Sequence, residues 1–339
     1  METLMPIKEI NVNKRNYTLD ALKFIFALFV ILVHFPFQGE VGLICSNIGI
    51  CGVILFFLIS GYSSYNKDDD IASKNILRRF KRNGITLLIV VAIYLVYTIL
   101  EKLLYGGFNE FVQELADPWR FPRLILLCDL SFIKGDPLWF MIALLWSYII
   151  LYFLHKYKVM KYAYYLLPVL ILSRVFVECY VNTYGTDWHY TSFFLTSGFP
   201  IMLLGNYIHC KKDAFLKAPL YVTIILTIVT TAMMFVTIHI RAFDYDIAQI
   251  FKIWCMVEIF ILALKLPGKK EIPLLSKLGR KYSAYIYLFH FLIGMLVYGI
   301  FYVEWVIQIC VVIVSVLISI LICELVHLIK RKIKSRKVN

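Results

Sequence analysis

The sequence has little charge and no polar block long enough to form a second folded unit. Charged residues make up 17% of the 339 residues and apolar residues 61%, whereas soluble domains have roughly 25% charged residues. This scarcity of charge excludes a disordered chain, a coiled coil, a disulfide-rich secreted domain and almost any soluble enzyme, because one soluble core could not bury so much apolar surface. We therefore predict a single all-helical domain in a lipid bilayer.

The sequence also lacks the cysteine patterns of metal and redox sites. Its eight cysteines include no C-x-x-C pair and no Cys/His cluster with the spacing of a zinc site. They are scattered through or beside apolar runs, where cysteine is usually a small packing residue. No metal site is therefore predicted.

Two further signals are missing. The first apolar run, residues 24–33, is not followed by the small-residue cleavage site of a secretory signal, so we expect this run to be retained. No internal repeat is visible, although two similar halves are common in secondary transporters. The sequence therefore gives no sign of a cleaved leader or of a repeat-built transporter.

What the sequence does contain is a series of apolar runs close to the length of about 20 residues that a membrane-spanning helix needs. Ten runs are predicted to span the bilayer, at residues 19–37, 43–65, 83–104, 137–155, 162–178, 193–210, 219–240, 247–266, 282–300 and 305–328. The segment 105–136 is broken by glycines and prolines and is predicted to be interfacial or re-entrant. The domain organisation that follows is a cytoplasmic segment 1–18, one transmembrane domain 19–328 and a basic cytoplasmic tail 329–339.

The basic residues predict the orientation. Of the 35 Lys and Arg residues, 27 fall in segments that share one side of the membrane if the N-terminus is inside, and only five fall on the other side. Because the side that keeps Lys and Arg is the cytoplasm, we expect both termini to be cytoplasmic in a multi-pass protein of the cytoplasmic membrane. The net charge of +13 then reflects contact with anionic membrane lipids, not nucleic acid, and would attract an anionic cytoplasmic ligand.

Ionisable residues inside a bilayer are costly, so those in the first span are candidate functional residues. Lys23 and His34 are 11 positions apart, which places them on one helix face about 16 Å apart along the axis. Asp20 lies three positions before Lys23 and can pair with it. This face is predicted to carry a cation near the cytoplasm and an imidazole toward the outer side. The alternative for His34 is a histidine that merely packs between helices.

Three arginines follow the second span. Arg79 and Arg82 form an R-x-x-R pair on one face of a helix, with Arg78 beside it. Two guanidinium groups on one face suit the binding of a phosphate group. The alternative is that these are ordinary basic residues at a cytoplasmic helix end.

Other ionisable residues fall inside later spans. Arg174 and Glu178 are at i, i+4 and could pair with each other or bind a substrate. Lys252, Glu258 and Glu324 are equally open to a structural or a functional interpretation.

Several short motifs run along the chain in a fixed order. LDALK at 19–23 is followed by His34, by GVxxFFxxSGY at 52–62 and by RRxxR at 78–82. Further along come PLWFM at 137–141, GFPIMLLG at 198–205 and YSAYIYLFH at 282–290. This succession resembles the acyltransferase-3 family of membrane O-acyltransferases over nearly the whole chain. Lys23 stands where many members have arginine, and LWF at 138–140 stands where many have a WSLxxE motif.

The resemblance implies an enzyme that transfers an acyl group, by default acetyl from acetyl-CoA, to a hydroxyl group. It implies that Lys23 and His34 are the catalytic pair, to which we add Asp20 as the partner of Lys23. The residues implied to bind the acyl-CoA donor are Arg78, Arg79 and Arg82. The residues expected to bind the acceptor are Trp139, Arg174, Glu178 and His290.

In this interpretation His34 is the general base that activates the acceptor hydroxyl, and acyl-CoA approaches from the cytoplasm. The acceptor is expected to be an extracytoplasmic glycan or a lipid-linked sugar. The sequence does not single out a carboxylate that orients His34; the candidates are Asp129, Asp136, Glu178 and Asp244.

Two other functional classes stay open. Buried charges such as Arg174, Lys252 and Glu258 would also suit a carrier or flippase for a small solute or a lipid-linked sugar. A structural or sensory membrane protein would leave the alignment of Lys23 with His34 unexplained. The arginine motif favours the enzyme, because a carrier of neutral solutes has no need of a phosphate-binding group.

Overall fold

The structure is a computed structural model that describes residues 15–240, 246–268, 273–298 and 305–336. All regular elements in these ranges are helices, which confirms the predicted all-α class. The longer ones are α1 (Tyr17–His34), α2 (Gly39–Tyr62), α3 (Asp69–Tyr105), α6 (Trp139–Lys156), α8 (Leu167–Tyr184), α9 (Gly198–Cys210), α11 (Leu220–Ile240), α12 (Asp246–Lys265), α14 (Ser283–Tyr298) and α15 (Val306–Arg336). The shorter ones are α4 (Phe108–Ala116), α5 (Arg120–Leu126), α7 (Met160–Tyr165), α10 (Lys212–Lys217), α13 (Pro273–Lys281) and the 3-10 turns η1 (Ser131–Ile133), η2 (Asp136–Leu138) and η3 (Trp188–Ser192).

Within the described ranges, six helices are long and apolar enough to cross a membrane, and they identify a multi-pass membrane protein. They are α1, α2, α3, α6 with η2, α11 and α15. The other four predicted spans coincide with α8, α9, α12 and α14. Of these, α9 has 13 residues and α14 has 16, while α8 and α12 carry charged residues. The number of ten crossings therefore stays a prediction.

The segment 105–136 folds into α4, α5, η1 and the start of η2 beside the end of α3. None of these elements exceeds nine residues, so none is long enough to span a bilayer. The indole Nε1 of Trp146 on α6 donates a hydrogen bond of 2.9 Å to the carbonyl oxygen of Ile125. This bond ties the segment to the transmembrane bundle.

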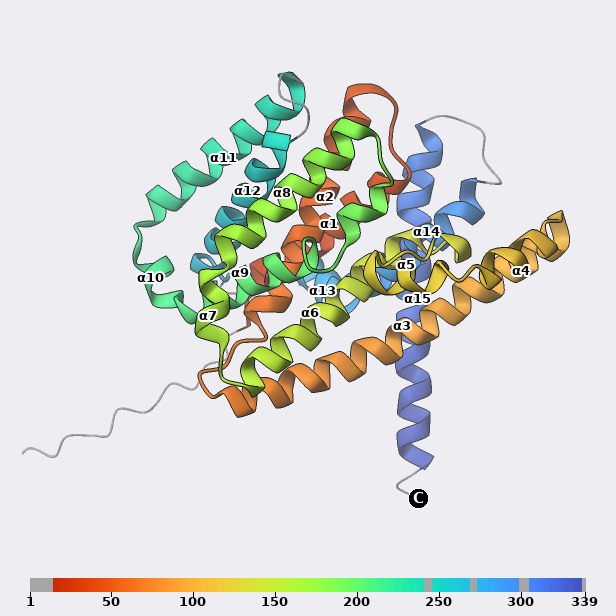
Figure 1. The fold of residues 1–339 in the computed structure, drawn as a ribbon, viewed down its shortest axis with the longest axis horizontal. Coiled ribbons are helices and arrows are strands. Elements are labelled where there is room, and N and C mark those ends of the chain that lie inside the picture. The colour runs from red at the N-terminus through yellow and green to blue at the C-terminus, as the bar shows by residue number, and fades with distance from the viewer. Residues whose placement is uncertain (1–14, 241–245, 269–272, 299–304, 337–339) are drawn as a thin grey trace, which may run out of the picture.

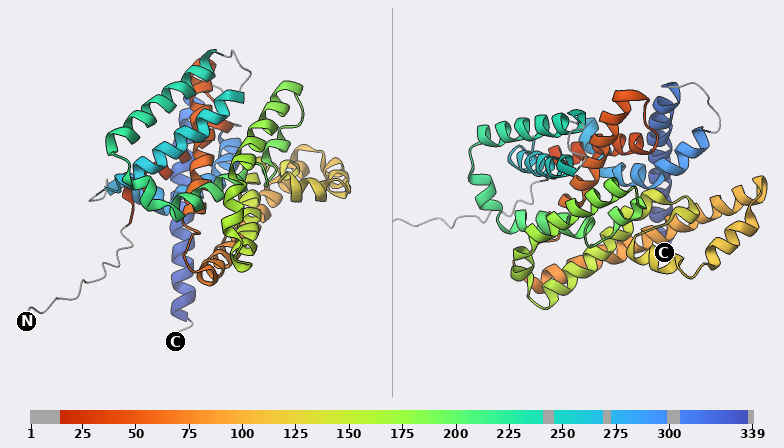
Figure 2. Two further views of the ribbon diagram at one scale, coloured as in Figure 1. Left: turned by 60° about the vertical axis from the view of Figure 1, so that its left-hand side comes forward. Right: turned by 45° about the horizontal axis from the view of Figure 1, so that its top comes forward.

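Helices α1 and α2 occupy the centre of the bundle (Figure 1). The α11 and α12 pair lies to one side of them, α14 and α15 pair on the other, and α3 runs along α6. Helix α15 continues unbroken to Arg336, so the basic tail is helical as far as it is described, and this end projects beyond the neighbouring helices (Figure 2).

Glycines allow α2 to touch the backbones of two neighbours. A Cβ at Gly49 would lie 2.4 Å from the carbonyl oxygen of Phe29 in α1, and one at Gly61 would lie 1.9 Å from that of Met202 in α9. Gly205 of α9 approaches α2 in return, since a Cβ there would lie 2.2 Å from the carbonyl oxygen of Leu58. Small residues at such crossings are typical of helices that associate in a membrane.

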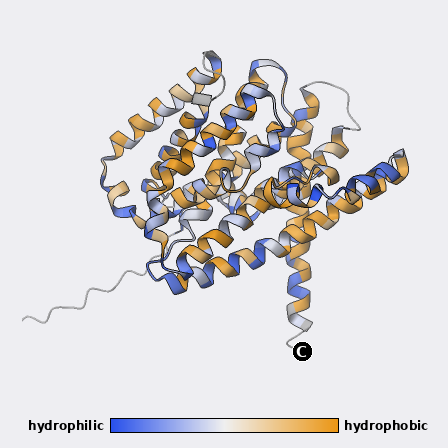
Figure 3. Cartoon of the chain, in the orientation of Figure 1, coloured by the Kyte–Doolittle hydropathy of each residue, from blue (hydrophilic) through white to orange (hydrophobic). Residues whose placement is uncertain are grey.

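Apolar side chains cover the outside of the bundle. The middle of α3 and most of α11 are apolar, and polar residues gather toward helix ends and connecting segments (Figure 3). Leu88 in the middle of α3 is 70% exposed. A continuous exposed apolar surface of this kind suits contact with lipid and not with water.

The glycine contacts generate a prediction about stability. Replacing Gly61 or Gly205 with alanine should lower the free energy of unfolding by about 1–3 kcal/mol, because the added methyl group collides with backbone that cannot move aside. Gly84 of α3 is the matched control, since a Cβ there meets no atom within 4 Å. Thermal unfolding midpoints in detergent test this; equal midpoints for Gly61→Ala and Gly84→Ala would contradict it.

Candidate active site

A cavity of about 440 Å³ lies at the end of α1 that carries His34. It is bordered by α1, α2, α6, α8, α12, α14 and the η2 and η3 turns. Polar side chains that line it are His34, Asp136, Arg174, Glu178, Thr191, Ser192 and Gln249. Aromatic side chains that line it are Trp139, Trp188, Tyr287 and Phe291. The structure therefore brings together four residues predicted from the sequence, which are His34, Trp139, Arg174 and Glu178.

His34 is the last residue of α1 and reaches the cavity from the helix end. Its ring centroid lies 5.3 Å from that of His290 and 5.2 Å from that of Phe291, both on α14. No hydrogen bond joins the His34 ring to another residue that the structure describes. The imidazole is therefore available to a ligand in the cavity.

His290 lies behind His34 and is completely buried, with an exposed fraction of 0%. Its Nδ1 is 2.7 Å from the carbonyl oxygen of Tyr287, while its Nε2 has no partner among the described residues. The Tyr287 hydroxyl in turn donates to the carbonyl oxygen of Pro137 at 2.6 Å. The predicted substrate-binding residue His290 thus contacts His34 but does not line the cavity.

Arg174 and Glu178 form the pair that their spacing allows. Arg174 Nη2 is 3.4 Å from Glu178 Oε1, and its Nη1 donates to the carbonyl oxygen of Ser197 at 3.1 Å. Gln249 Nε2 on α12 lies 3.4 Å from the other carboxylate oxygen of Glu178. Of the two possibilities left open by the sequence, the pairing is present; both residues also line the cavity, and substrate binding stays a prediction.

Two more charged residues of α12 are buried. Lys252 is only 2% exposed and interacts electrostatically with Glu178 and Cys51. Glu258 accepts a hydrogen bond of 3.3 Å from the indole of Trp254. Neither residue lines the cavity around His34.

Asp20 and Lys23 lie at the opposite end of α1 from His34. Asp20 is buried and accepts hydrogen bonds from Arg15 at 2.7 and 2.8 Å and from Lys23 at 3.1 Å. The predicted pairing of Asp20 with Lys23 is therefore present. Of the three predicted catalytic residues, only His34 lines the cavity.

The arginine motif sits near the start of α3. Arg79 is turned toward the end of α2, where it donates to the hydroxyl of Ser63 at 2.6 Å and to its carbonyl oxygen at 2.9 Å. Arg78 and Arg82 are exposed, and their guanidinium groups make no hydrogen bond or ion pair with the described part of the chain. Arg79 thus joins α3 to α2, while the other two arginines are open to a ligand.

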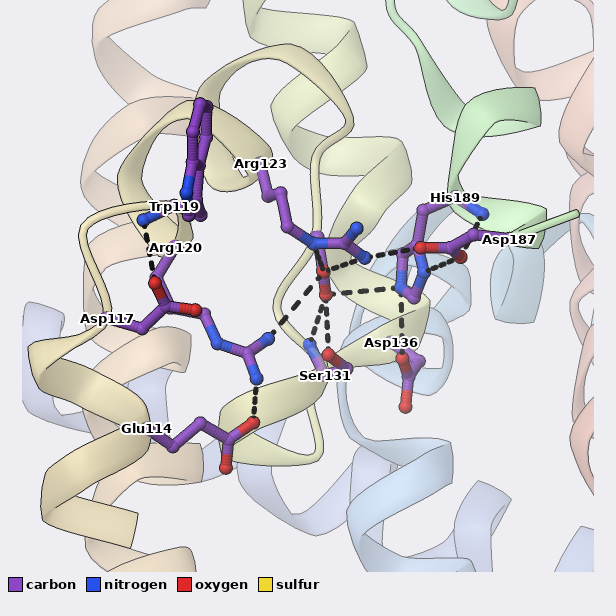
Figure 4. Close-up of polar contacts among 10 residues, drawn as sticks. Glu114, Asp117, Trp119, Arg120, Arg123, Ser131, Asp136, Asp187 and His189 are labelled. Atoms are coloured by element: carbon purple, nitrogen blue, oxygen red, sulfur yellow. Dashed lines mark hydrogen bonds and ion pairs between the residues drawn. The ribbon is translucent and has the colours of Figure 1, made fainter.

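A cluster of ion pairs adjoins the cavity at η3 (Figure 4). His189 Nδ1 is 2.7 Å from Asp187, and its Nε2 is 3.1 Å from Asp129 and 3.7 Å from Asp136. Arg123 binds Asp129 and Asp187 at 2.7 and 2.6 Å. Asp136 also lines the cavity, so the cluster forms part of the cavity wall.

Contacts within the cluster change the pKa values of its members. Burial lowers the pKa of His189, but hydrogen bonds to Asp129, Asp136 and Asp187 outweigh burial and raise that pKa from 6.5 to about 10. Burial raises the pKa of Asp187, but hydrogen bonds from His189 and Arg123 bring it down to about 2. The same balance, with Ser131 as an additional donor, holds the pKa of Asp129 well below its usual range. His189, Asp129 and Asp187 are therefore charged at neutral pH.

The family comparison gives an independent result. The sequence matches the family model of an acyltransferase domain over residues 16–324, nearly the whole chain. The chain belongs to the acyltransferase-3 family. Two other comparisons, with curated proteins and with solved structures, give no match. The resemblance inferred from the motifs is thus confirmed, and the chain is a membrane protein of an acyltransferase family.

Several residues of this acyltransferase-3 domain were missed by sequence reasoning. Gln249, Trp188 and Ser192 line the cavity, and His189 organises the cluster beside it. The only local signal was the succession Asp187-Trp188-His189 between two predicted spans. Uncharged residues such as Gln249 and Ser192 carry no such signal.

The structure distinguishes between the candidates for a carboxylate partner of His34. Asp136 and Glu178 line the same cavity as His34, whereas Asp129 is bound by His189 and Arg123. Asp244 lies outside the described residues. Across the described ranges of the acyltransferase-3 domain, no group of three or more His, Cys, Asp or Glu side chains is placed to hold a metal ion.

The cluster predicts a pH-dependent contribution to stability. Because the pKa of His189 is raised on folding, its contribution is complete below its ordinary pKa of 6.5 and is lost as the pH rises toward about 10. The Asp129 and Asp187 contributions are present above their ordinary pKa of 3.8 and are lost at lower pH. His189→Gln should therefore lower the free energy of unfolding by about 1–3 kcal/mol near pH 5–6, and by less at pH 10.

Thermal unfolding of the two proteins in detergent across this pH range tests the prediction. His327→Gln, an exposed change on α15, is the control. A difference between the unaltered protein and His189→Gln that stays constant from pH 5 to pH 10 would show that the ionised cluster does not stabilise the fold.

Proposed function

We propose that this protein transfers an acyl group, by default acetyl, from cytoplasmic acyl-CoA to a hydroxyl group of an extracytoplasmic glycan or lipid-linked sugar. The observation that carries the proposal is the position of His34. Its imidazole faces a cavity that is lined by carboxylate, amide and indole side chains, and it makes no hydrogen bond to another described residue. A base in such a cavity suits the activation of a hydroxyl group.

The cavity wall has the chemistry of a carbohydrate site. The indoles of Trp139 and Trp188 offer flat apolar surfaces for the faces of a sugar ring. Carboxylate and amide oxygens of Asp136, Glu178 and Gln249 can accept hydrogen bonds from its hydroxyl groups. The His189 cluster forms the neighbouring wall, where an acceptor from the extracytoplasmic side would arrive.

The acyl-CoA donor is assigned to the arginine motif. Coenzyme A is polyanionic, and Arg78 and Arg82 are exposed cations that can bind its phosphates. Arg79 contributes by holding α3 against the end of α2. Asp20 and Lys23 lie at the end of α1 remote from His34, so Lys23 would meet the donor along its path to the cavity.

The reaction needs one base and one leaving group. His34 takes the proton of the acceptor hydroxyl while the hydroxyl oxygen attacks the carbonyl carbon of the thioester. The carbon–sulfur bond then breaks, and the departing thiolate of coenzyme A receives the proton from His34. An ester and free coenzyme A result, and His34 returns to its neutral state.

We further propose ten membrane crossings with both termini in the cytoplasm, in the cytoplasmic membrane. Each of the ten apolar runs falls on a helix, and the asymmetry of Lys and Arg supports this orientation. The buried charges of α8 and α12 then lie at membrane depth, paired or beside the cavity. Membrane lipids are the expected partners of the apolar outer surface and of the basic tail.

His34→Ala should reduce acyl transfer and acetyl-CoA hydrolysis by at least about 100-fold, because general base catalysis contributes about 10²–10⁴-fold. Release of label from radiolabelled acetyl-CoA by purified protein in proteoliposomes measures this. His327→Ala, on the far part of α15, is the control and should keep the activity. If label release does not depend on His34 and the same liposomes take up solute, the protein is a carrier and not an acyltransferase.

Arg82→Ala and Arg78→Ala should each weaken acetyl-CoA binding by roughly tenfold, since a charged hydrogen bond is worth about 1.5–3 kcal/mol. Both side chains are exposed, so thermal stability should not change. Arg79→Ala should in addition lower the unfolding temperature, because the α2–α3 bond is lost. Titration of each variant with acetyl-CoA measures the affinity, with Arg331→Ala as the control. Unchanged affinity in the Arg78 and Arg82 variants would show that this motif does not bind the donor.

A further inference from the structure

We propose that His290 is a positioning residue that fixes the tautomer and the orientation of His34, through a hydrogen bond between the two imidazole rings. This inference rests on the proposed acyl transfer, in which His34 is the base. It assigns to His290 a role different from the acceptor binding that the resemblance led us to expect.

The contacts of His290 determine its tautomer. Its Nδ1 lies 2.7 Å from the carbonyl oxygen of Tyr287. A carbonyl oxygen only accepts hydrogen bonds, so Nδ1 carries the proton and Nε2 is an acceptor in the neutral ring. This Nε2 is buried and has no partner among the described residues. A buried acceptor without a donor is costly, so a donor is needed at this position.

The rings of His290 and His34 lie close enough for a hydrogen bond between them. The ring centroids of the two histidines are 5.3 Å apart with an interplanar angle of 44°. Two imidazole rings joined by an N–H···N hydrogen bond of about 3 Å have their centroids close to this separation. The other ring beside His34 is Phe291, which offers no hydrogen-bond acceptor. The separation of the two rings is therefore compatible with an N–H···N bond from His34 to Nε2 of His290.

The consequence concerns the second nitrogen of His34. Once one nitrogen donates to His290, the other must carry the lone pair, and that nitrogen faces the cavity. The hydrogen bond made by one nitrogen of a histidine commonly decides which nitrogen can act as the base. His290 would thus do for His34 what a carboxylate does in many hydrolases, without placing a further buried charge beside the cavity.

No carboxylate takes this place in the described part of the chain. Asp136 lies 3.7 Å from His189, and Glu178 is engaged by Arg174 and Gln249. Asp20 is 14 residues before His34, or about 21 Å along the helix. Because His290 is buried and does not line the cavity, it acts on the substrate only through His34.

Two variants test the roles of the two ring nitrogens of His290 independently. His290→Asn keeps a donor where Nδ1 lies and removes the acceptor, while His290→Gln extends an amide to the place of Nε2 and keeps an acceptor for His34. We expect kcat to fall by roughly 100-fold in His290→Asn, since small misplacements of a catalytic group have effects of this size. His290→Gln should stay within about tenfold of the unaltered protein, and the KM for acetyl-CoA should not change in either variant.

The control is His327→Asn, whose Nδ1 also contacts a backbone carbonyl oxygen, that of Cys323 at 2.7 Å, on α15. Its kcat and pH profile should match those of the unaltered protein. The low-pH limb of the kcat profile, which reports the base, should shift in His290→Asn and not in the control. Equal kcat values and pH profiles in His290→Asn and His290→Gln would overturn the positioning role while leaving acyl transfer intact.

A second measurement does not depend on turnover. Diethyl pyrocarbonate modifies the unprotonated nitrogen of histidine, and mass spectrometry follows modification of His34. The rate should fall several-fold in His290→Asn relative to His290→Gln at the same thermal unfolding midpoint. Equal rates in two folded variants would reject the inference, whereas activity that survives His34→Ala would reject the proposed function itself.

Discussion

The contact of α2 with the backbones of α1 and α9 is the constraint on which the site depends. Lipid does not drive apolar helices together as water does, so close packing at small residues has to hold them. Gly49 and Gly61 provide this packing on two sides of α2, because a side chain at either position would overlap a neighbouring backbone oxygen. With α1 held against α2, its two ends present Asp20 and His34 to opposite ends of the bundle.

Charged groups beside the cavity are paired with groups of opposite charge. Arg174 is paired with Glu178, and His189 is surrounded by carboxylates, as expected where unpaired charge is costly. One of the buried polar atoms without a partner in the described structure lies close to the cavity: it is Nε2 of His290, whose ring centroid is 5.3 Å from that of His34. A buried acceptor of this kind needs a donor, and the His34 ring is the nearest candidate to supply it.

Sequence reasoning predicted the local features and missed those that depend on packing. Apolar runs identified every long helix, and helix geometry predicted the Asp20–Lys23 pair. It did not predict that Arg79 turns toward Ser63, because free carbonyl groups at the end of α2 attract a donor from another helix. Nor could it bring His290 to His34, since 256 residues separate them and only the packing of α14 against α1 joins them. The crossings at α8 and α12 stay ambiguous from hydropathy because charged residues interrupt their apolar character.

In the proposed reaction the acyl group reacts at His34, inside the cavity, while the nucleotide part of coenzyme A stays at the arginine motif. A structure with an acetyl-CoA analogue whose thioester sulfur is replaced by a methylene group tests it most directly. We expect the phosphates beside Arg78 and Arg82 and the acyl carbonyl carbon in the cavity, within about 4 Å of the site of attack beside His34. An analogue bound with its acyl group outside the cavity, or with its phosphates at the His189 cluster, would show that the reaction does not take place at His34 in this way.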